Sequence, residues 1–148
     1  MRRVIWQVAA LVLVVALPTG CKKKAPPVPA AVEPAPAPPP VAMAAVDLGR
    51  AIGADKKVTA ATAVFGVRDT IYASVSTTGV AASAVLTAKW TFQTGQLVDS
   101  TSQPIAPTGP ATTEFHIAKA SAWPAGKYKV AVSLNGGAPI EKEFEVKK

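Results

Sequence analysis

Hydrophobic and polar residues alternate with a period of two in four short stretches of the second half of the chain. The apolar positions of these stretches are Ile71/Ala73/Val75, Leu86/Ala88/Trp90/Phe92, Phe115/Ile117 and Tyr128/Val130/Val132/Leu134. A period of two is the repeat of a half-buried antiparallel β-strand. Gly and Pro separate the stretches at intervals of about ten to fifteen residues, which favours a β-sandwich or barrel over a helical bundle.

The last two predicted strands can be aligned from their apolar faces. Residues 128–134 and 140–146 must place their apolar side chains on the same face of the sheet. A loop with an odd number of residues, containing Asn135-Gly136-Gly137, allows this. The predicted pairs are Tyr128–Phe144, Val132–Ile140, Lys127–Glu145 and Lys129–Glu143. Lys142 then faces inward, which predicts an edge strand, because inward lysines there block edge-to-edge aggregation.

Residues 44–62 have a weaker pattern. Short strands are predicted at 46–48 and 58–60, around a turn at Gly53-Ala54-Asp55-Lys56. A helix over 48–54 is the alternative.

The N-terminus has a different pattern. Arg2 and Arg3 precede an apolar run at 4–17 that is interrupted only by Gln7. This arrangement predicts a secretory signal peptide over residues 1–20. A transmembrane helix needs roughly 20 apolar residues, so the run is short for a permanent span.

The sequence Leu17-Pro18-Thr19-Gly20-Cys21 resembles the signal of bacterial lipoproteins, in which a Leu, a small pair and a Cys mark the cleavage site. Pro18 departs from the family pattern, which usually has Leu there. The resemblance implies that Cys21 carries a thioether-linked diacylglycerol, and several acyl chains together make a durable membrane anchor. Because Lys22 is not Asp, it also implies the outer membrane, facing the periplasm. The alternative is ordinary secretory cleavage after Gly20.

Residues 21–43 are predicted to be a linker. Three lysines follow Cys21, and residues 25–43 contain eight of the fourteen prolines. Pro removes backbone donors and fixes φ, so this tract is expected to be an extended tether of about 3.1 Å per residue. The folded domain is therefore expected at 44–148.

Charge and residue counts exclude several functions. Residues 44–148 hold eleven Lys and Arg against eight Asp and Glu, so the domain carries +3 of the net charge of +7 and is only mildly basic. Lysines spread singly do not make the basic face that nucleic-acid binding needs. With one Cys and one His, an intrachain disulfide and a Cys- or His-rich metal site are excluded, and no cofactor is expected.

Two segments resemble strands C and F of immunoglobulin-like and fibronectin-III-like domains. They are Lys89-Trp90-Thr91-Phe92 and Gly126-Lys127-Tyr128-Lys129-Val130. The resemblance implies an all-β, immunoglobulin-like antiparallel β-sandwich in which the Trp packs in the core and the Tyr makes a corner contact. Val130 stands where the second Cys of such domains would be, so the sandwich is expected without a disulfide.

The sequence has none of the common catalytic motifs: no Gly-rich phosphate loop, HExxH or GxSxG. His116 is expected to be a solvated residue on the outer face of a strand. The aspartates at 47, 55, 69 and 99 do not have calcium-loop spacing and are expected in turns. We therefore expect a protein that is not an enzyme.

Two hypotheses of function remain. The first is a lipid-anchored envelope protein that presents the sandwich to another protein. The second is a carbohydrate- or peptidoglycan-binding module in which Trp123, beside Pro124, stacks on a sugar ring. The alternative for Trp123 is a structural one, in which the indole closes the open end of the core.

Overall fold

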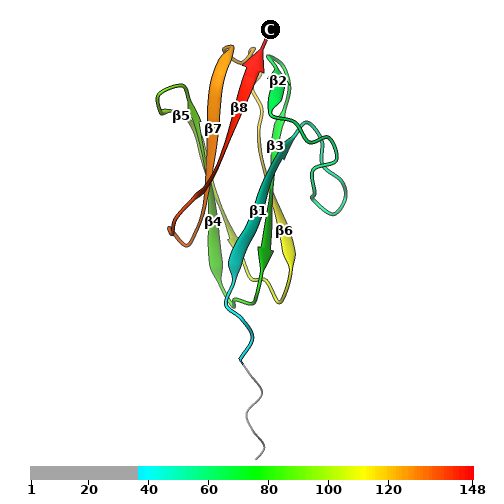
Figure 1. Cartoon of the computed structure of the whole chain (residues 1–148), viewed down its shortest axis with the longest axis vertical. Helices are drawn as coiled ribbons and strands as arrows, with labels where there is room; N and C mark the ends of the chain where they lie inside the picture. Colours follow the sequence, from blue (N-terminus) through cyan, green and yellow to red (C-terminus); the bar gives the residue numbers. More distant parts are fainter. Residues whose placement is uncertain (1–36) are drawn as a thin grey trace, which may run out of the picture. The chain divides into compact units, whose positions relative to one another are not determined.

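The alternating stretches fold as β-strands. The computed structural model describes residues 37–148, and these residues contain eight strands and no helix (Figure 1). The strands are β1 (Ala42–Gly49), β2 (Val64–Gly66), β3 (Ile71–Thr78), β4 (Ala84–Phe92), β5 (Gln96–Ile105), β6 (Ala111–Ile117), β7 (Gly126–Leu134) and β8 (Ile140–Lys147). The all-β prediction is confirmed. β1 begins two residues before the predicted domain boundary at residue 44, and the signal peptide, Cys21 and most of the predicted linker lie outside the described residues.

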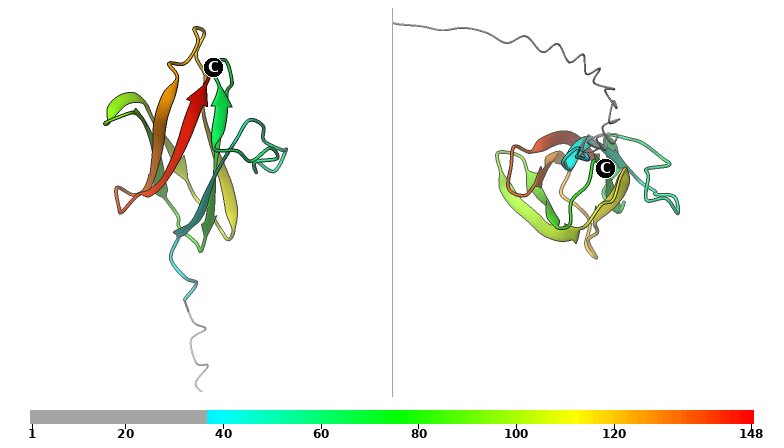
Figure 2. Two further views of the ribbon diagram at one scale, coloured as in Figure 1. Left: turned by 45° about the horizontal axis from the view of Figure 1, so that its top comes forward. Right: turned by 90° about the horizontal axis from the view of Figure 1, so that it is seen from below.

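The strands form two facing sheets (Figure 2). One has the order β1-β3-β6 and the other β2-β8-β7-β4-β5. All neighbouring strands are antiparallel except β2 and β8, which are parallel. Both sheets turn apolar side chains toward each other, and Trp90, Phe65 and Phe115 are the largest fully buried side chains of the core.

The predicted strand faces are confirmed. The inward positions of β3, β4, β6 and β7 are buried, apart from Phe92 and Leu134 at the strand ends, which are half-buried. The predicted register of β7 and β8 is also confirmed, with Tyr128 opposite Phe144 and Lys129 opposite Glu143. A one-residue slip would have exposed the whole apolar face of β8.

The prediction that the last strand lies at an edge was wrong. The short strand β2 pairs with the second half of β8, from Val64 opposite Glu145 to Gly66 opposite Lys147. Lys142 lies in the first half, where β2 does not reach, and its side chain is exposed. A three-residue strand has too little alternation to be predicted from the sequence.

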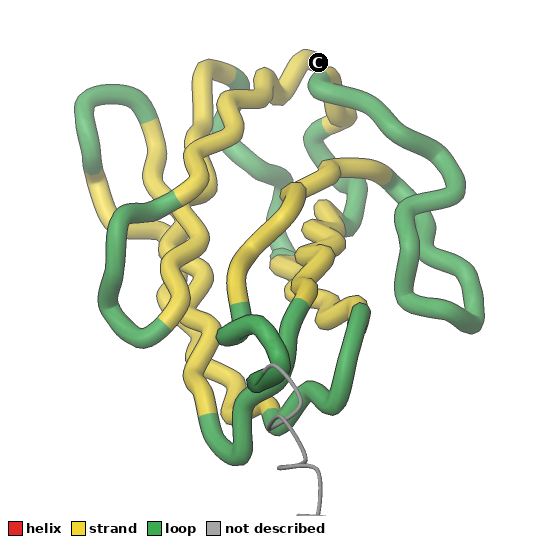
Figure 3. The backbone as a smooth tube through the Cα atoms, turned by 60° about the horizontal axis from the view of Figure 1, so that its bottom comes forward, coloured by secondary structure: helices red, strands yellow, loops and turns green. Residues whose placement is uncertain are grey.

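The segment between β1 and β2 is a loop rather than a helix (Figure 3). A bridge between Ile52 and Val58 closes a turn in which Asp55 Oδ1 accepts the backbone N–H of Lys57. The turn predicted at 53–56 is therefore confirmed, and the helix alternative is wrong. Asp55 is a turn residue as expected, whereas Asp47 and Asp99 lie within β1 and β5.

The two ends of the sandwich differ. The chain enters β1 at one end, where Ala42 lies opposite Thr78 of β3. At the other end Ile71, the first residue of β3, lies opposite Ile117, the last residue of β6. Seven residues of strand at about 3.3 Å each separate these ends by about 23 Å. We call them the entry end and the distal end; β8 and the chain finish at the distal end (Figure 1).

Candidate interaction site at the distal end

Tyr128 anchors the start of β7 at the distal end. Its Oη donates a hydrogen bond of 2.8 Å to the backbone carbonyl of Pro124, four residues earlier. Its ring stacks on that of Phe144, with centroids 5.3 Å apart and planes 16° from parallel. Burial raises the pKa of the Tyr128 hydroxyl. The hydrogen bond ties the loop between β6 and β7 to the core.

Trp123, in the same loop, is buried, with only 6% of its surface exposed. Its backbone N–H donates to the carbonyl of Val67 at 2.7 Å, and its indole Nε1 donates to the carbonyl of Asp69 at 2.9 Å. The ring packs edge-on against Tyr128. Trp123 therefore joins the loop between β6 and β7 to the turn between β2 and β3.

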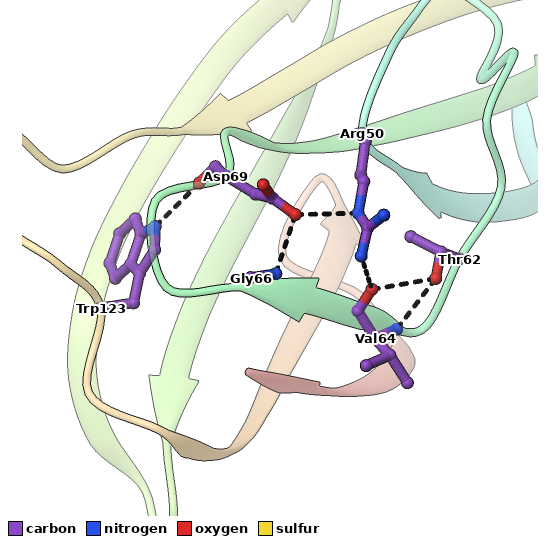
Figure 4. Close-up of polar contacts among 6 residues, drawn as sticks. All are labelled: Arg50, Thr62, Val64, Gly66, Asp69 and Trp123. Carbon is purple, nitrogen blue, oxygen red and sulfur yellow. Dashed lines mark hydrogen bonds and ion pairs between the residues drawn. The ribbon is translucent and has the colours of Figure 1, made fainter. Parts of the chain in front are cut away.

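A polar network holds that turn in place (Figure 4). Asp69 Oδ2 accepts the backbone N–H of Gly66 at 2.8 Å and forms an ion pair of 2.8 Å with Arg50 Nε. Arg50 Nη2 also donates to the carbonyl of Val64. Because the Arg50 side chain is half exposed, this ion pair contributes little energy. Together with the hydrogen bonds it links β2 to the turn that receives Trp123.

A cleft of about 720 Å³ opens beside Trp123, between β5 and β6. We call it the distal cleft. Its buried or half-buried lining comprises Phe92, Val98, Ile117, Trp123 and Tyr128, and its exposed lining comprises Gln96, Leu97, Asp99, His116, Ala118, Lys119 and Pro124. Leu97 is 56% exposed, the most exposed of the large hydrophobic residues between positions 37 and 148. Ligand sites typically combine such a volume with an apolar lining and a few polar groups.

The charged groups of the cleft are available to a ligand. Among residues 37–148, neither Asp99 nor Lys119 forms an ion pair. Lys119 Nζ lies 5.9 Å from the centre of the Trp123 ring, and Thr101 donates a hydrogen bond to Asp99. His116 lies on the outer face of β6 as expected, with Nδ1 3.5 Å from Glu114. The cleft thus offers both a carboxylate and an ammonium group.

The structure brings three residues singled out by the sequence, His116, Trp123 and Tyr128, to one cleft. The sequence did not indicate the contribution of β5. Leu97 and Asp99 lie on an edge strand whose residues are mostly exposed and polar, and such a strand has almost no apolar alternation. Cys21 lies outside the described residues.

Two general features complete the description. Within residues 37–148, no group of three or more His, Cys, Asp and Glu side chains is arranged to hold a metal ion. The same residues include no helix long and apolar enough to cross a membrane.

No protein-family model and no curated protein matches the chain. Among solved structures, a β-glucosidase from Erythrobacter marinus is similar, with a TM-score of 0.52 and 9% identity over 72% of this chain and 15% of that one. A β-glucosidase from Listeria innocua gives 0.49 and 10% over 72% and 16%, and an alkylpurine DNA glycosylase from Pseudomonas fluorescens gives 0.42 and 18% over 70% and 30%. The chain spans less than a third of the length of each, and at these identities the likeness concerns the fold alone.

Proposed function

We propose that the protein is a non-enzymatic, lipid-anchored protein of the cell envelope, and that its immunoglobulin-like sandwich binds another protein through the distal cleft. The observation that carries the proposal is the position of the cleft. The chain joins the sandwich at the entry end, and the cleft opens at the distal end. The point at which the chain joins the sandwich is therefore separated from the cleft by the length of the strands.

The immunoglobulin-like type of the sandwich is supported by three features. Trp90 is fully buried between the sheets, as the resemblance to strand C implies. Tyr128 makes the hydrogen bond of a tyrosine corner. The central order β8-β7-β4 corresponds to strands G, F and C, and the facing order β1-β3-β6 corresponds to strands A, B and E.

The anchor is supported by the sequence of the N-terminus. Cys21 ends a segment that resembles a lipoprotein signal, and a proline-rich tract separates it from β1. A lipid anchor and a polyproline tether together suit a domain that must reach a partner away from the membrane surface.

The anchor is tested by fractionating the envelope of cells that produce Cys21→Ser. We expect the variant to lose its acyl label and to leave the outer-membrane fraction, because the thiol that carries the lipid is gone. Lys22→Asp is the matched control: it retains the thiol, and we expect it to stay membrane-bound but move to the inner membrane. Membrane association unchanged in Cys21→Ser would contradict the anchor.

The binding surface is tested by placing a photo-crosslinking amino acid at Leu97 in the full chain. We expect a specific covalent adduct with an envelope protein, because Leu97 lies on the rim of the distal cleft. Val85 is the matched control, since it is another exposed apolar residue, 40% exposed and near the entry end. Equal adducts from both positions, or none from Leu97, would contradict the assignment.

The carbohydrate alternative is not part of this proposal. Stacking on a sugar requires an open indole face, whereas Trp123 is 6% exposed and Lys119 lies over its ring. Its Nε1 is already bonded to Asp69.

A further inference from the structure

The outer edge of β6 faces the distal cleft and has free backbone groups. Gln103 Nε2, from β5, donates a hydrogen bond of 2.8 Å to the carbonyl of Glu114, so the backbone of Glu114 points away from β3. Thr77 Oγ1, from β3, donates to the carbonyl of Ala111, so Ala111 points toward β3. Backbone direction alternates along a strand, and the N–H and C=O of His116 therefore also point outward. In residues 37–148, no strand pairs with this edge.

Gln103 occupies a position that a pairing strand would take. Its side-chain amide gives the Glu114 carbonyl the donor that a neighbouring backbone N–H would supply. Within residues 37–148, this bond is the hydrogen bond that joins β5 to β6. Beyond it, toward the distal end, the two strand edges enclose the cleft. The carbonyl of Glu114 on this edge is thus satisfied, and the edge is open at His116.

The other sheet edges are less suitable. β1 lies beside β8, and β2 has only three residues, with its Val64 carbonyl bonded to Arg50. On β5, the nitrogen of Pro104 lies on the outer edge. Its partner on β4 is Val85, whose backbone N–H and C=O both bond to Asn135, on the side away from β5. The backbone hydrogen bonds between β4 and β5 are therefore made by the even-numbered residues of β4 and their odd-numbered partners on β5, and Pro104 is not among them. A proline at an outward position removes a donor and discourages pairing.

The occupant of the cleft can be specified from its chemistry. It must supply backbone donors and acceptors to β6 and an apolar side chain to Val98 and Ile117, which an extended peptide does. Asp99 on one wall and Lys119 on the other have no ion pair among residues 37–148, so they favour a peptide with a basic and an acidic residue flanking the apolar one.

We propose that an extended peptide segment of a partner protein adds to the outer edge of β6 as a further strand, with an apolar side chain in the distal cleft and flanking charges opposite Asp99 and Lys119. The inference rests on the proposed function and names the kind of partner.

The test uses a phage-displayed library of random linear twelve-residue peptides, selected on the purified full chain. His116→Pro removes the outward N–H of β6 without touching the ladder with β3, in the way that Pro104 is already accommodated on β5. His116→Ala removes the imidazole and keeps that N–H. Because both variants lack the imidazole and differ in the backbone N–H, we expect the selected peptides to bind His116→Pro at least tenfold more weakly than His116→Ala. Equal losses in both variants, or no selected peptide, would overturn the proposal.

Two further measurements do not depend on the folding of His116→Pro. N-methylation of alternate residues of a selected peptide is expected to abolish binding in one of the two possible phases only, because only one set of N–H groups faces β6. Binding that tolerates both phases, or neither, would overturn strand addition. Gln103→Ala is expected to bind the peptides more tightly, since it frees the Glu114 carbonyl, and weaker binding would contradict this pairing position.

The outcome can be separated from that of the proposed function. If strand addition fails while a crosslink at Leu97 persists in cells, the cleft binds a folded surface instead of an extended peptide. If no crosslink forms at Leu97, the proposed function itself fails.

Discussion

At the scale of single residues, Tyr128 affects the stability of the domain in several ways. Its ring fills the core beside Phe144, while its hydroxyl reaches out of the core to the Pro124 carbonyl. Burial of the hydroxyl disfavours the phenolate, which raises its pKa above the ordinary value of 10.0. The same side chain therefore contributes packing, a hydrogen bond and a dependence of stability on pH.

Tyr128→Phe is expected to lower the free energy of unfolding by about 1 kcal/mol, because it removes one hydrogen bond and leaves the Pro124 carbonyl without its donor. Tyr72→Phe is the matched control, since the Tyr72 hydroxyl makes none of the side-chain hydrogen bonds found within residues 37–148. Chemical denaturation at neutral pH measures both. An equal effect in the two variants would show that the corner bond is not the cause.

The pH dependence of the same variant has a definite sign. Because the pKa of Tyr128 is raised on folding, its stabilisation is complete below pH 10 and is lost as the pH rises through the folded-state pKa. Lys129, whose pKa is raised by its hydrogen bond to Glu141, adds a loss of the same sign. The free energy of unfolding, measured at a series of pH values from 8 upward, should therefore fall less steeply with pH for Tyr128→Phe than for the unchanged chain.

At the scale of elements, the hairpin of β7 and β8 shows how local chemistry sets a register. Asn135 and Gly136 both have positive φ, at 51° and 71°, and Gly137 N–H bonds back to the Leu134 carbonyl. Positive φ at two successive residues matches the right-handed twist of the flanking strands. The loop therefore supports the pairing that the apolar faces already require.

Asn135 tolerates positive φ and also bonds to β4, since its Oδ1 accepts the Val85 N–H at 2.8 Å. Asn135→Gly should lose only this bond, at a cost of about 0.5–1 kcal/mol. Asn135→Ala should lose the bond and strain the backbone, at a cost of about 1–2 kcal/mol. Thermal unfolding of the unchanged chain and the two variants tests this order of stability. An alanine variant as stable as the glycine variant would contradict the role of the positive φ.

The elements also show why the prediction from sequence was incomplete. β3, β4, β6 and β7 each bury most of one face, so their alternation can be recognised in the sequence. β5 has only Val98, Gln103 and Ile105 half-buried among ten residues, and its sequence does not predict a strand. An edge strand covers little of the core, and its sequence therefore carries a weak apolar signal. One wall of the distal cleft was missed with it.

At the scale of the whole molecule, Trp123 connects parts that are distant in sequence. It binds the turn that joins β2 of one sheet to β3 of the other, and it supports the wall of the distal cleft. Trp90 differs from it. It is fully buried, yet its Nε1 has no hydrogen-bond partner within residues 37–148. The two tryptophans therefore separate packing from hydrogen bonding.

Trp123→Phe is expected to cost about 2 kcal/mol, from the lost Nε1 bond and a smaller buried side chain. It should also speed amide hydrogen exchange in the turn at 67–70, because the turn loses the indole N–H that holds its carbonyl. Trp90→Phe is the control: it reduces packing in the core, and the turn should keep its protection. Unchanged exchange in Trp123→Phe would contradict the connecting role.

The sequence by itself determined which face of each regular strand is buried, the register of the last hairpin and the inward position of Trp90, because alternation along a strand is a local property. Only the tertiary structure decided that β2 covers half of β8, that Trp123 is buried and that β5 and β6 enclose a cleft. These features depend on which edges and loops meet in space. Such meetings join residues far apart in the chain, and no local pattern specifies them.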